Sequence, residues 1–528
     1  MMTLSLPFEV LYILHCFAKQ NKEAYLVGGA VRDLLLNQAD RPVKDFDFAT
    51  NAHPEEIQQL FDNAFYENKF GTVSLNHDDL LQLLKKYQLP AADLSTTKKE
   101  PTSTKVRIID LKNASKIHVS LRENKQNVDQ TENEQNLVPA FEMTTYRSDG
   151  LYNDHRRPET VDFGHSLEED LKRRDFTVNA MAISLDPAYL EEVFANSILQ
   201  TDYLINEENF TLIDLHHGQE DLQLRVLRTV GEADERFKED ALRMLRAIRL
   251  AVQLNMDIET NTYFAIKFNK DLLRFVSMER VRDEFLGILK SQNPAKGIEM
   301  LDESGLLEQI IPELYQGRGM QQRGHHISDV WTHSIDALRH CPSTDPVVRL
   351  ATLLHDIGKP STYQEDEHSQ ITFYNHDVLG ARTASYVAKR LRMSKKDIQR
   401  IFTLVRYHMF YYQPHHTDAA IRRFMRKVGL ENIDDILDLR EGDRLGSGAK
   451  KTSWRLEEMK QRVIEQLNQP AGLDDLAING NDLMQELGIK PGPQLGQILH
   501  HLLEIVLEDP TRNTRENLLD EAKSYSDQ

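Results

Sequence analysis

The sequence contains little that could cross-link the chain or anchor it in a membrane. Only Cys16 and Cys341 are cysteines among 528 residues, so neither a disulfide framework nor a cysteine-based zinc site is available. No apolar run approaches the ~20 residues needed to cross a bilayer. The N-terminal residues, MMTLSLPFEV, lack the basic and apolar regions of a signal peptide. We therefore expect a protein of the reducing cytoplasm.

Positive charge is scarce as well. The chain has 64 Lys and Arg against 83 Asp and Glu, a formal net charge of −19. This balance argues against broad, nonspecific nucleic-acid binding. One stretch reverses it, because residues 382–427, here called the basic segment, contain 12 basic and 2 acidic side chains. The chain is also too long for one hydrophobic core, so we expect three or more domains.

Apolar residues are missing from a stretch in the first third of the chain. Residues 95–104 (STTKKEPTST) have no apolar side chain except proline, and residues 124–136 (NKQNVDQTENEQN) have only Val128. Such segments cannot bury enough surface to offset the entropy of ordering them. We expect a surface insertion at about residues 76–140.

A glycine pair near the N-terminus predicts an anion site. The apolar residues 25–27 run into Gly28 and Gly29, and an amphipathic helix follows. Such a turn lets the backbone approach a ligand closely and directs free helix N–H groups at an anion such as phosphate. Arg32, in the first helical turn, would add a charge-assisted contact.

An Asp-x-Asp pair follows. In a strand, Asp45 and Asp47 share one face, and Phe46 and Phe48 share the other. Two neighbouring carboxylates are costly without a cation between them, and Mg²⁺ with nucleotide phosphates is the usual one. Most isolated Asp-x-Asp pairs are solvated strand edges, and only a glycine pair followed by the two aspartates, in this order, indicates a metal–phosphate site.

Residues 236–253 predict a helix with Arg236, Asp240, Arg243 and Arg246 along one stripe. Most such stripes are exposed ion-pair networks. Hydrogen-bond inventories suggest a more specific role, because cytosine and adenine both present an amino donor beside a ring-nitrogen acceptor. A carboxylate that only accepts, next to a guanidinium that only donates, suits these two bases and rejects uracil and guanine.

GGAVRD followed by DFDFAT resembles the catalytic core of the class II nucleotidyltransferases, which include tRNA CCA-adding enzymes and bacterial poly(A) polymerases. Further motifs similar to that family are LKRRDFTVNAMA, IDLHHG, EDALR and ERVRDE, and the similarity covers residues 24–75 and 141–290. The resemblance implies transfer of nucleotidyl groups from CTP and ATP to the 3′ hydroxyl of tRNA, with release of pyrophosphate.

The resemblance also implies residue roles. Asp45, Asp47 and Glu142 would hold two Mg²⁺ ions. The other implied nucleotide contacts are Gly28, Gly29, Arg32, Arg174, Asp175, Asn179, Asp240, Arg243 and Arg246.

Two relatives within the family remain as alternatives. Residues 148–158 resemble the flexible loop of CCA- and A-adding enzymes, which CC-adding enzymes have shortened, so they favour full CCA addition. A poly(A) polymerase shares the head and neck motifs, but usually has a basic tail.

A second pattern resembles the HD-domain metal phosphohydrolases. Imidazoles and carboxylates from separate helices can close around a divalent cation and leave a position open for water. Ni²⁺, Mn²⁺, Co²⁺ and Fe²⁺ all suit such ligands, and the substrate would be a phosphoester such as a cyclic phosphate or 2′-phosphate at an RNA end. A rival hypothesis is therefore an HD hydrolase with a nucleotide-binding regulatory head. The matching residues are His333, His355, Asp356 and Asp443, with His376 and His408 either ligands of a second metal or ordinary histidines.

These patterns predict an α/β nucleotidyltransferase head with a small mixed sheet, followed by an all-α neck and body, an HD domain and a helical tail. The predicted boundaries are 1–184, 185–325, 326–446 and 447–528. We expect the basic segment to help hold tRNA, with Arg422, Arg423 and Arg426 as the RNA-binding residues to test.

Overall fold

The computed structural model contains two compact units. Of the described residues, those up to 288 and residues 296–310 belong to the first unit, and residues 289–295 and those from 311 onward belong to the second. The predicted insertion and the 148–158 loop lie outside the residues that the structure describes. Those residues are 3–36, 43, 45–61, 64–66, 72–75, 140–147, 164, 166–195, 200–322, 328–365, 367–368, 370–410, 412–449, 453–470 and 472–526.

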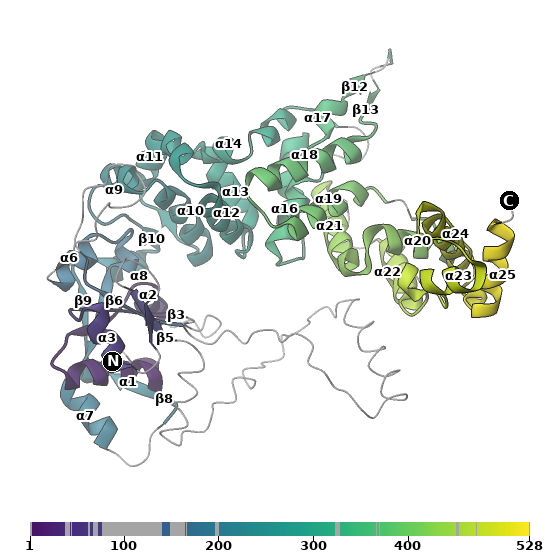
Figure 1. The fold of residues 1–528 in the computed structure, drawn as a ribbon. Coiled ribbons are helices and arrows are strands. Elements are labelled where there is room, and N and C mark those ends of the chain that lie inside the picture. Colours follow the sequence, from purple (N-terminus) through teal and green to yellow (C-terminus); the bar gives the residue numbers. More distant parts are fainter. Residues whose placement is uncertain are drawn as a thin grey trace. The chain divides into compact units, whose positions relative to one another are not determined.

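The first unit is built on a mixed sheet, as predicted, and this sheet has seven strands (Figure 1). The central strands β3 and β6 pair in parallel, and all other neighbours pair antiparallel. The sheet extends to Asp214, beyond the boundary predicted at residue 184. In spatial order the strands are β4 (Phe65–Tyr66), β5 (Thr72–Leu75), β6 (Ala140–Thr145), β3 (Asp45–Thr50), β2 (Ala24–Val27), β7 (Met181–Leu185) and β9 (Phe210–Asp214).

Around this sheet, apolar side chains face inward from short helices and from a separate strand pair, β1 (Thr3–Pro7) with β8 (Asp202–Asn206). The chain then becomes mostly helical, which confirms the predicted change after the head. The helices of the first unit are α1 (Phe8–Lys19), α2 (Gly29–Leu36), α3 (Pro54–Leu60), α6 (Leu167–Lys172), α7 (Pro187–Ala195), α8 (Gly218–Leu224), α9 (Ala233–Glu239), α10 (Leu242–Leu254), α11 (Thr260–Asn269), α12 (Met278–Leu289), α13 (Pro294–Glu303) and α14 (Leu306–Ile310).

The continuous helix predicted over residues 236–253 is wrong. The chain forms α9 and α10 with a break at Asp240, whose backbone is extended (φ −143°, ψ 102°). The Asp240 side chain accepts a hydrogen bond from the Leu242 backbone N–H at 3.1 Å. Aspartate competes in this way with helical hydrogen bonding and favours the start of a helix over its interior.

The second unit is a helical assembly, and its last helices enclose a core of their own around Leu502, Val506 and Leu518. Among the described residues, no helix combines the length and apolar content needed to cross a membrane. The helices of this unit are α15 (Val330–His340), α16 (Pro346–Leu354), α17 (Lys359–Thr362), α18 (His376–Arg390), α19 (Lys395–Tyr407), α20 (Asp418–Val428), α21 (Ile433–Gly446), α22 (Trp454–Gln466), α23 (Gly480–Leu487), α24 (Pro493–Glu508) and α25 (Arg515–Ser526).

Candidate nucleotide and metal sites

The glycine pair forms the turn between strand β2 and helix α2. Gly28 has φ +75°, a conformation that favours glycine, and an added Cβ would lie 2.9 Å from Arg174 Nη1 and 3.3 Å from Asp47 Oδ2. The absence of a side chain therefore lets the backbone lie against a guanidinium and a carboxylate at once.

The acidic face of the sheet lies beside this turn. Phe46 and Phe48 are buried and the side chain of Asp45 is exposed, so strand β3 alternates as the sequence pattern predicts. Asp47 is directly in register with Glu142 on the parallel strand β6. Residues in register across neighbouring strands share a face, so three carboxylates project from the same side of the sheet.

Asp47 is in an environment that is unfavourable for an isolated negative charge. Burial and the nearby charge of Asp45 raise the pKa of the Asp47 carboxyl, and Arg174 and Arg246 only partly offset this. A cation bound between the two aspartates would remove the unfavourable part of this arrangement.

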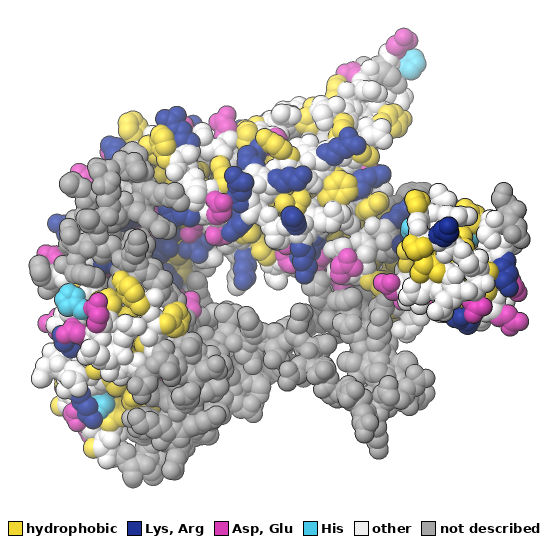
Figure 2. Space-filling model, viewed as in Figure 1, with side chains coloured by type: hydrophobic (Ala, Val, Ile, Leu, Met, Phe, Trp, Pro, Cys, Tyr) yellow, Lys and Arg dark blue, Asp and Glu magenta, His cyan; other side chains and the backbone are white. Residues whose placement is uncertain are grey.

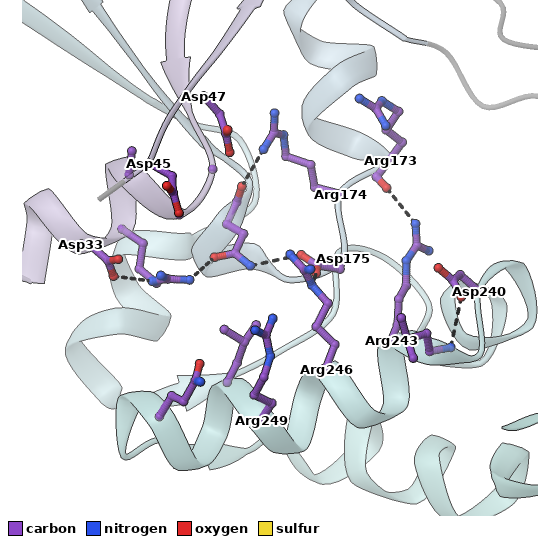
Figure 3. A pocket seen from close by; sticks show the side chains of 18 of the residues that line it. Asp33, Asp45, Asp47, Arg173, Arg174, Asp175, Asp240, Arg243, Arg246 and Arg249 are labelled. Carbon is purple, nitrogen blue, oxygen red and sulfur yellow. Dashed lines mark hydrogen bonds and ion pairs between the residues drawn. The ribbon is translucent and has the colours of Figure 1, made fainter. Parts of the chain in front are cut away.

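A cavity of about 850 Å³, here called the arginine pocket, opens beside these aspartates. Figure 3 shows Asp45 and Asp47 on one side, Asp240 and Arg243 on the other, and Arg174, Asp175 and Arg246 between them. Its charged lining residues are Arg32, Asp33, Asp45, Asp47, Arg173, Arg174, Asp175, Asp240, Arg243, Arg246, Arg249 and Arg280.

A hydrogen-bonded chain of side chains crosses the floor of the arginine pocket. Arg32, which is only 6% exposed, donates to Asn179 Oδ1 at 2.7 Å, and Asn179 donates to Asp175 Oδ1 at 3.2 Å. Asp175 also accepts a hydrogen bond from Arg246. Burial disfavours the charged carboxyl, but Arg246 and Asn179 lower the pKa of Asp175, so a fixed ion pair lies in the middle of the pocket.

Asp170 holds two arginines of the RRD sequence in place and was not predicted as a site residue. It is 1% exposed and accepts hydrogen bonds from Arg173 Nε at 3.0 Å and Arg174 Nη2 at 3.0 Å. Asp170 lies on α6 and precedes these two arginines, which follow the end of that helix, by three and four residues, and this spacing is the sequence signal that pointed to it.

The predicted base-reading pair is braced on both sides. Asp240 accepts a hydrogen bond from Arg280 Nη2 at 2.7 Å. Arg243 donates to Glu239 Oε2 at 2.6 Å and to the Arg173 carbonyl at 3.2 Å. Arg280 lies in the ERVRDE segment, one of the motifs that resemble the family.

Arg249 was missed by the sequence analysis. It lines the pocket and pairs with Glu284 at 2.7 Å. Burial lowers the pKa of Arg249 and raises that of Glu284. The spacing of three residues from Arg243 to Arg246 to Arg249 would have extended the predicted stripe by one helical turn.

The second unit brings together all six residues of the HD pattern in what we call the histidine–aspartate centre. Two groups of three have ligand atoms within 4.8 Å of one another: His333, His355 and Asp443, and then Asp356, His376 and His408. All six side chains are buried.

Asp356 lies between the two groups. Its Oδ2 is 3.2 Å from His355 Nε2, and its Oδ1 is 3.6 Å from His376 Nε2 and 3.7 Å from His408 Nε2. In the other group, His333 Nε2 is 3.2 Å from Asp443 Oδ1. The position of Asp356 suits a carboxylate that contacts two cations.

Glycines allow the helices of this centre to approach closely. An added Cβ at Gly442 would lie 2.6 Å from the Ala337 carbonyl oxygen, which shows how tightly α21 packs on α15. An added Cβ at Gly358 would lie 2.2 Å from the carbonyl oxygen of His376, the first residue of α18. Any larger residue at these positions would separate the elements that carry the candidate ligands.

The histidine tautomers fit metal ligation. The Nδ1 atoms of His355, His376 and His408 are 2.7, 2.8 and 2.7 Å from the backbone carbonyls of Thr352, Phe373 and Val405. A carbonyl only accepts, so each Nδ1 carries a proton and each Nε2 is directed into the centre, where it can ligate a metal once it is deprotonated. Ligating histidines usually have such a backbone or carboxylate partner. Among the described residues, nothing hydrogen-bonds His376 Nε2 or His408 Nε2.

The groups around the two aspartates of the centre favour their ionised form. Burial disfavours their charge, but His355 and Lys359 hold the pKa of Asp356 well below its usual range, and hydrogen bonds from His333 and His355 do the same for Asp443. Against the effect of burial, these carboxylates raise the pKa of His355 to about 10. In the metal-bound protein, the metal cation would compensate the negative charge of these two buried carboxylates.

The centre opens into a cavity of about 1010 Å³. Lys359, Arg440 and Arg444 supply positive charge along its wall, and Phe373 and Tyr374 supply aromatic surface. This lining can accept a phosphoester attached to a planar group.

The three arginines predicted to hold tRNA have protein partners. Arg422 is 5% exposed and donates to the Leu507 carbonyl at 2.9 Å. Arg423 pairs with Glu508 at 2.7 Å and Arg426 pairs with Glu504 at 2.6 Å, both on α24. These contacts fasten α20 to α24, so RNA binding by these arginines stays a prediction.

Family models match three parts of the chain. Residues 24–107 and 82–228 match a model described as "Poly A polymerase head domain". Residues 255–316 match "Probable RNA and SrmB- binding site of polymerase A", and residues 367–522 match a model of tRNA nucleotidyltransferase domain 2.

Whole proteins are similar too. An A-adding tRNA nucleotidyltransferase of Deinococcus radiodurans is 35% identical over 353 residues, covering 64% of this chain and 75% of that protein. A CCA-adding enzyme of Streptococcus agalactiae is 28% identical over 521 residues, covering 98% of this chain and 96% of that protein. The crystal structure of the Bacillus stearothermophilus CCA-adding enzyme in complex with CTP matches with a TM-score of 0.61 at 25% identity, covering 98% of both chains.

Proposed function

Because the chain belongs to the family of tRNA nucleotidyltransferases and poly(A) polymerases, we propose that it adds C, C and A to the 3′ end of tRNA from CTP and ATP. One observation carries this proposal. A single pocket joins a face of carboxylates, Asp45 and Asp47, to a braced Asp240–Arg243 pair through a row of arginines. Phosphate, metal and base chemistry therefore meet in one cavity.

The carboxylates would hold two Mg²⁺ ions. Asp45 and Asp47 offer oxygen ligands, with Glu142 in register beside Asp47, and oxygen ligands are what Mg²⁺ prefers. The ions would promote attack by the tRNA 3′ hydroxyl on the α-phosphorus and stabilise the leaving pyrophosphate. Arg32 and Arg174 would hold the triphosphate oxygens beside the Gly28 turn.

The base would be selected by protein groups alone. Asp240 can accept from the amino group shared by cytosine and adenine, and Arg243 can donate to the neighbouring ring nitrogen. Arg280 and Glu239 hold this pair in place before the nucleotide arrives. Uracil and guanine would place a carbonyl oxygen against a carboxylate, which is repulsive.

The test is extension of four tRNA acceptors that end before the CCA sequence, after the first C, after CC, and after CCA. Each is incubated with Mg²⁺ and CTP, ATP or both, and its 3′ end is sequenced. We expect the shorter three to be completed to CCA and the last to remain unchanged. The 35% identical A-adding relative makes A-only addition a second candidate, which would extend only the acceptor ending in CC. Long A tails would indicate a poly(A) polymerase.

We also propose that the histidine–aspartate centre is the active site of a phosphohydrolase activity and binds divalent transition-metal ions. The observation in favour is the set of buried histidine Nε2 atoms that converge on Asp356. His333, His355, Asp356 and Asp443 would hold one ion, and His376 and His408 would hold a second with Asp356. Metal ions would activate water to attack a phosphoester, and Lys359 and Arg440 would attract the phosphate.

Hydrolysis of RNA ending in a 2′,3′-cyclic phosphate or a 2′-phosphate, with Mn²⁺, Co²⁺, Ni²⁺ or Fe²⁺, tests this second activity. Opening of the cyclic phosphate to a phosphomonoester, or release of inorganic phosphate from the 2′-phosphate, that is lost in His355→Ala is the expected result. No hydrolysis with any of the four metals would contradict it, and would leave the centre without a catalytic role.

A further inference from the structure

A groove runs between α18 and α19 on the second unit. It encloses about 440 Å³ and is lined by three cations, Arg382, Lys389 and Lys395, together with Ser385 and Gln399. Half-buried Ile398 and Phe402 complete its lining. The cationic side chains are exposed and no carboxylate lines the groove.

These three cations differ from their neighbours in lacking ion-pair partners. On the same two helices, Arg390 pairs with Glu313 at 2.6 Å, and Arg400 pairs with Asp345 at 2.7 Å. Within the described part of the chain, Arg382, Lys389 and Lys395 have no carboxylate at ion-pairing distance. The folded chain thus pairs the neighbouring arginines with carboxylates, and leaves the three cations of the groove available to bind an anionic ligand.

The local charge is opposite to that of the whole protein. Residues 376–407, which span α18 and α19, contain eight basic and two acidic side chains in a chain of net charge −19. In Figure 2, Lys and Arg side chains gather over the place where Figure 1 draws these two helices. A cationic patch on an anionic protein attracts polyanions while the remaining surface repels them.

We propose that the α18–α19 groove binds the phosphodiester backbone of RNA. Three separated cations can each contact one phosphate, and the Ser385 hydroxyl and Gln399 amide can donate to phosphate oxygens or ribose hydroxyls. Such contacts position an RNA without selecting its sequence, which suits an enzyme that must accept many tRNAs. The inference rests on the proposed function for the identity of the RNA, a tRNA.

The groove faces away from the residues already assigned to catalysis. Arg382 is six positions after His376 on α18, and Lys389 is thirteen positions after it. At 100° per residue, Arg382 lies about 120° and Lys389 about 140° around the helix from that histidine. Removing the cations should therefore leave the histidine–aspartate centre intact.

The test compares two triple variants that remove the same net charge. The groove variant is Arg382→Gln with Lys389→Gln and Lys395→Gln. The control is Lys396→Gln with Lys490→Gln and Lys523→Gln, three exposed lysines that do not line the groove. Affinity for a tRNA lacking CCA is measured over a range of salt concentrations, together with KM and kcat for nucleotide addition and the melting temperature.

We expect the groove variant to bind tRNA roughly 10- to 100-fold more weakly at low salt, with a salt dependence lower by about 2–3 in slope. KM for tRNA should rise, and kcat and the melting temperature should stay near the wild-type values. An unchanged slope, or an equal loss in the control, would overturn the groove assignment. Wild-type protein that neither binds nor extends tRNA would instead refute the proposed function, and the groove assignment with it.

Discussion

In the arginine pocket the charged side chains are already paired with each other, Asp175 with Arg246 and Asp240 with Arg280. At the histidine–aspartate centre, by contrast, ring nitrogens of His376 and His408 face Asp356 with no hydrogen bond from the described residues. Asp45 is exposed at the first site, whereas His333 and His355 are 0% exposed at the second.

This difference shows two ways of preparing for a metal ion. The arginine pocket is an open site. Mg²⁺ is expected to bind there together with the nucleotide, whose phosphates complete the coordination of the ion. The histidine–aspartate centre is a buried site, and its nitrogen and carboxylate ligands suit a transition metal that stays bound during purification. Variants that affect one site and leave the other unchanged test this contrast.

The largest effect is expected from Asp47→Asn. Losing one carboxylate of the pair removes a ligand for both proposed ions, so nucleotide addition should fall by at least about 1,000-fold. Glu142→Gln should cost less, because Glu142 does not line the pocket. Single-turnover addition of CMP to tRNA measures both. Equal losses in the two variants would place Glu142 among the essential ligands.

A smaller but sharper effect is expected from His376→Ala. This change removes a ligand from one group and leaves His333, His355 and Asp443 in place. Metal analysis of the purified protein should show a decrease from about two ions per chain to about one, and hydrolysis should fall by about 10- to 100-fold. Wild-type protein that retains no transition metal would contradict the proposed difference between an open Mg²⁺ site and a buried transition-metal site.

Base selection should respond next. In Asp240→Ala the acceptor for the amino group of cytosine and adenine is lost, so discrimination against UTP should drop by about 10- to 100-fold. Arg280→Gln should give a smaller drop, because Arg280 only holds the carboxylate in position. The ratio of kcat/KM for CTP and UTP is the measurement. If both variants keep the wild-type ratio, base selection depends on other groups.

The smallest effect concerns stability and pH. Burial raises the pKa of Asp47 in the folded protein, so the folded state binds this proton more tightly than the unfolded state. The free energy of unfolding is therefore highest when Asp47 is protonated, and it falls as the pH rises through the interval between the unfolded and folded pKa values of Asp47. Without Mg²⁺, Asp47→Asn should melt higher than wild type at about pH 7.5, and the difference should shrink toward about pH 4. The opposite trend would contradict the direction of the shift.

Local patterns in the sequence predicted the aspartate and glycine part of the arginine pocket. The alternation of Asp45 and Asp47 with buried phenylalanines and the glycine turn at Gly28 depend only on strand period and backbone conformation. The same reasoning predicted the mixed sheet and the change to helices.

Pairings between distant segments were not predictable from such patterns. Arg280 reaches Asp240 across 40 residues, and Arg422 reaches the Leu507 carbonyl across 85. The basic segment was therefore interpreted as one RNA surface, although the fold pairs Arg423 and Arg426 with carboxylates of α24. A run of charge in a sequence does not show which members remain unpaired.

The most direct test of the account measures both activities in the same two variants, Asp47→Asn and His355→Ala. We expect Asp47→Asn to lose CCA addition and keep phosphoester hydrolysis, and His355→Ala to do the reverse. Loss of both activities in either variant, with the fold intact, would contradict the conclusion that this chain carries two separate metal sites.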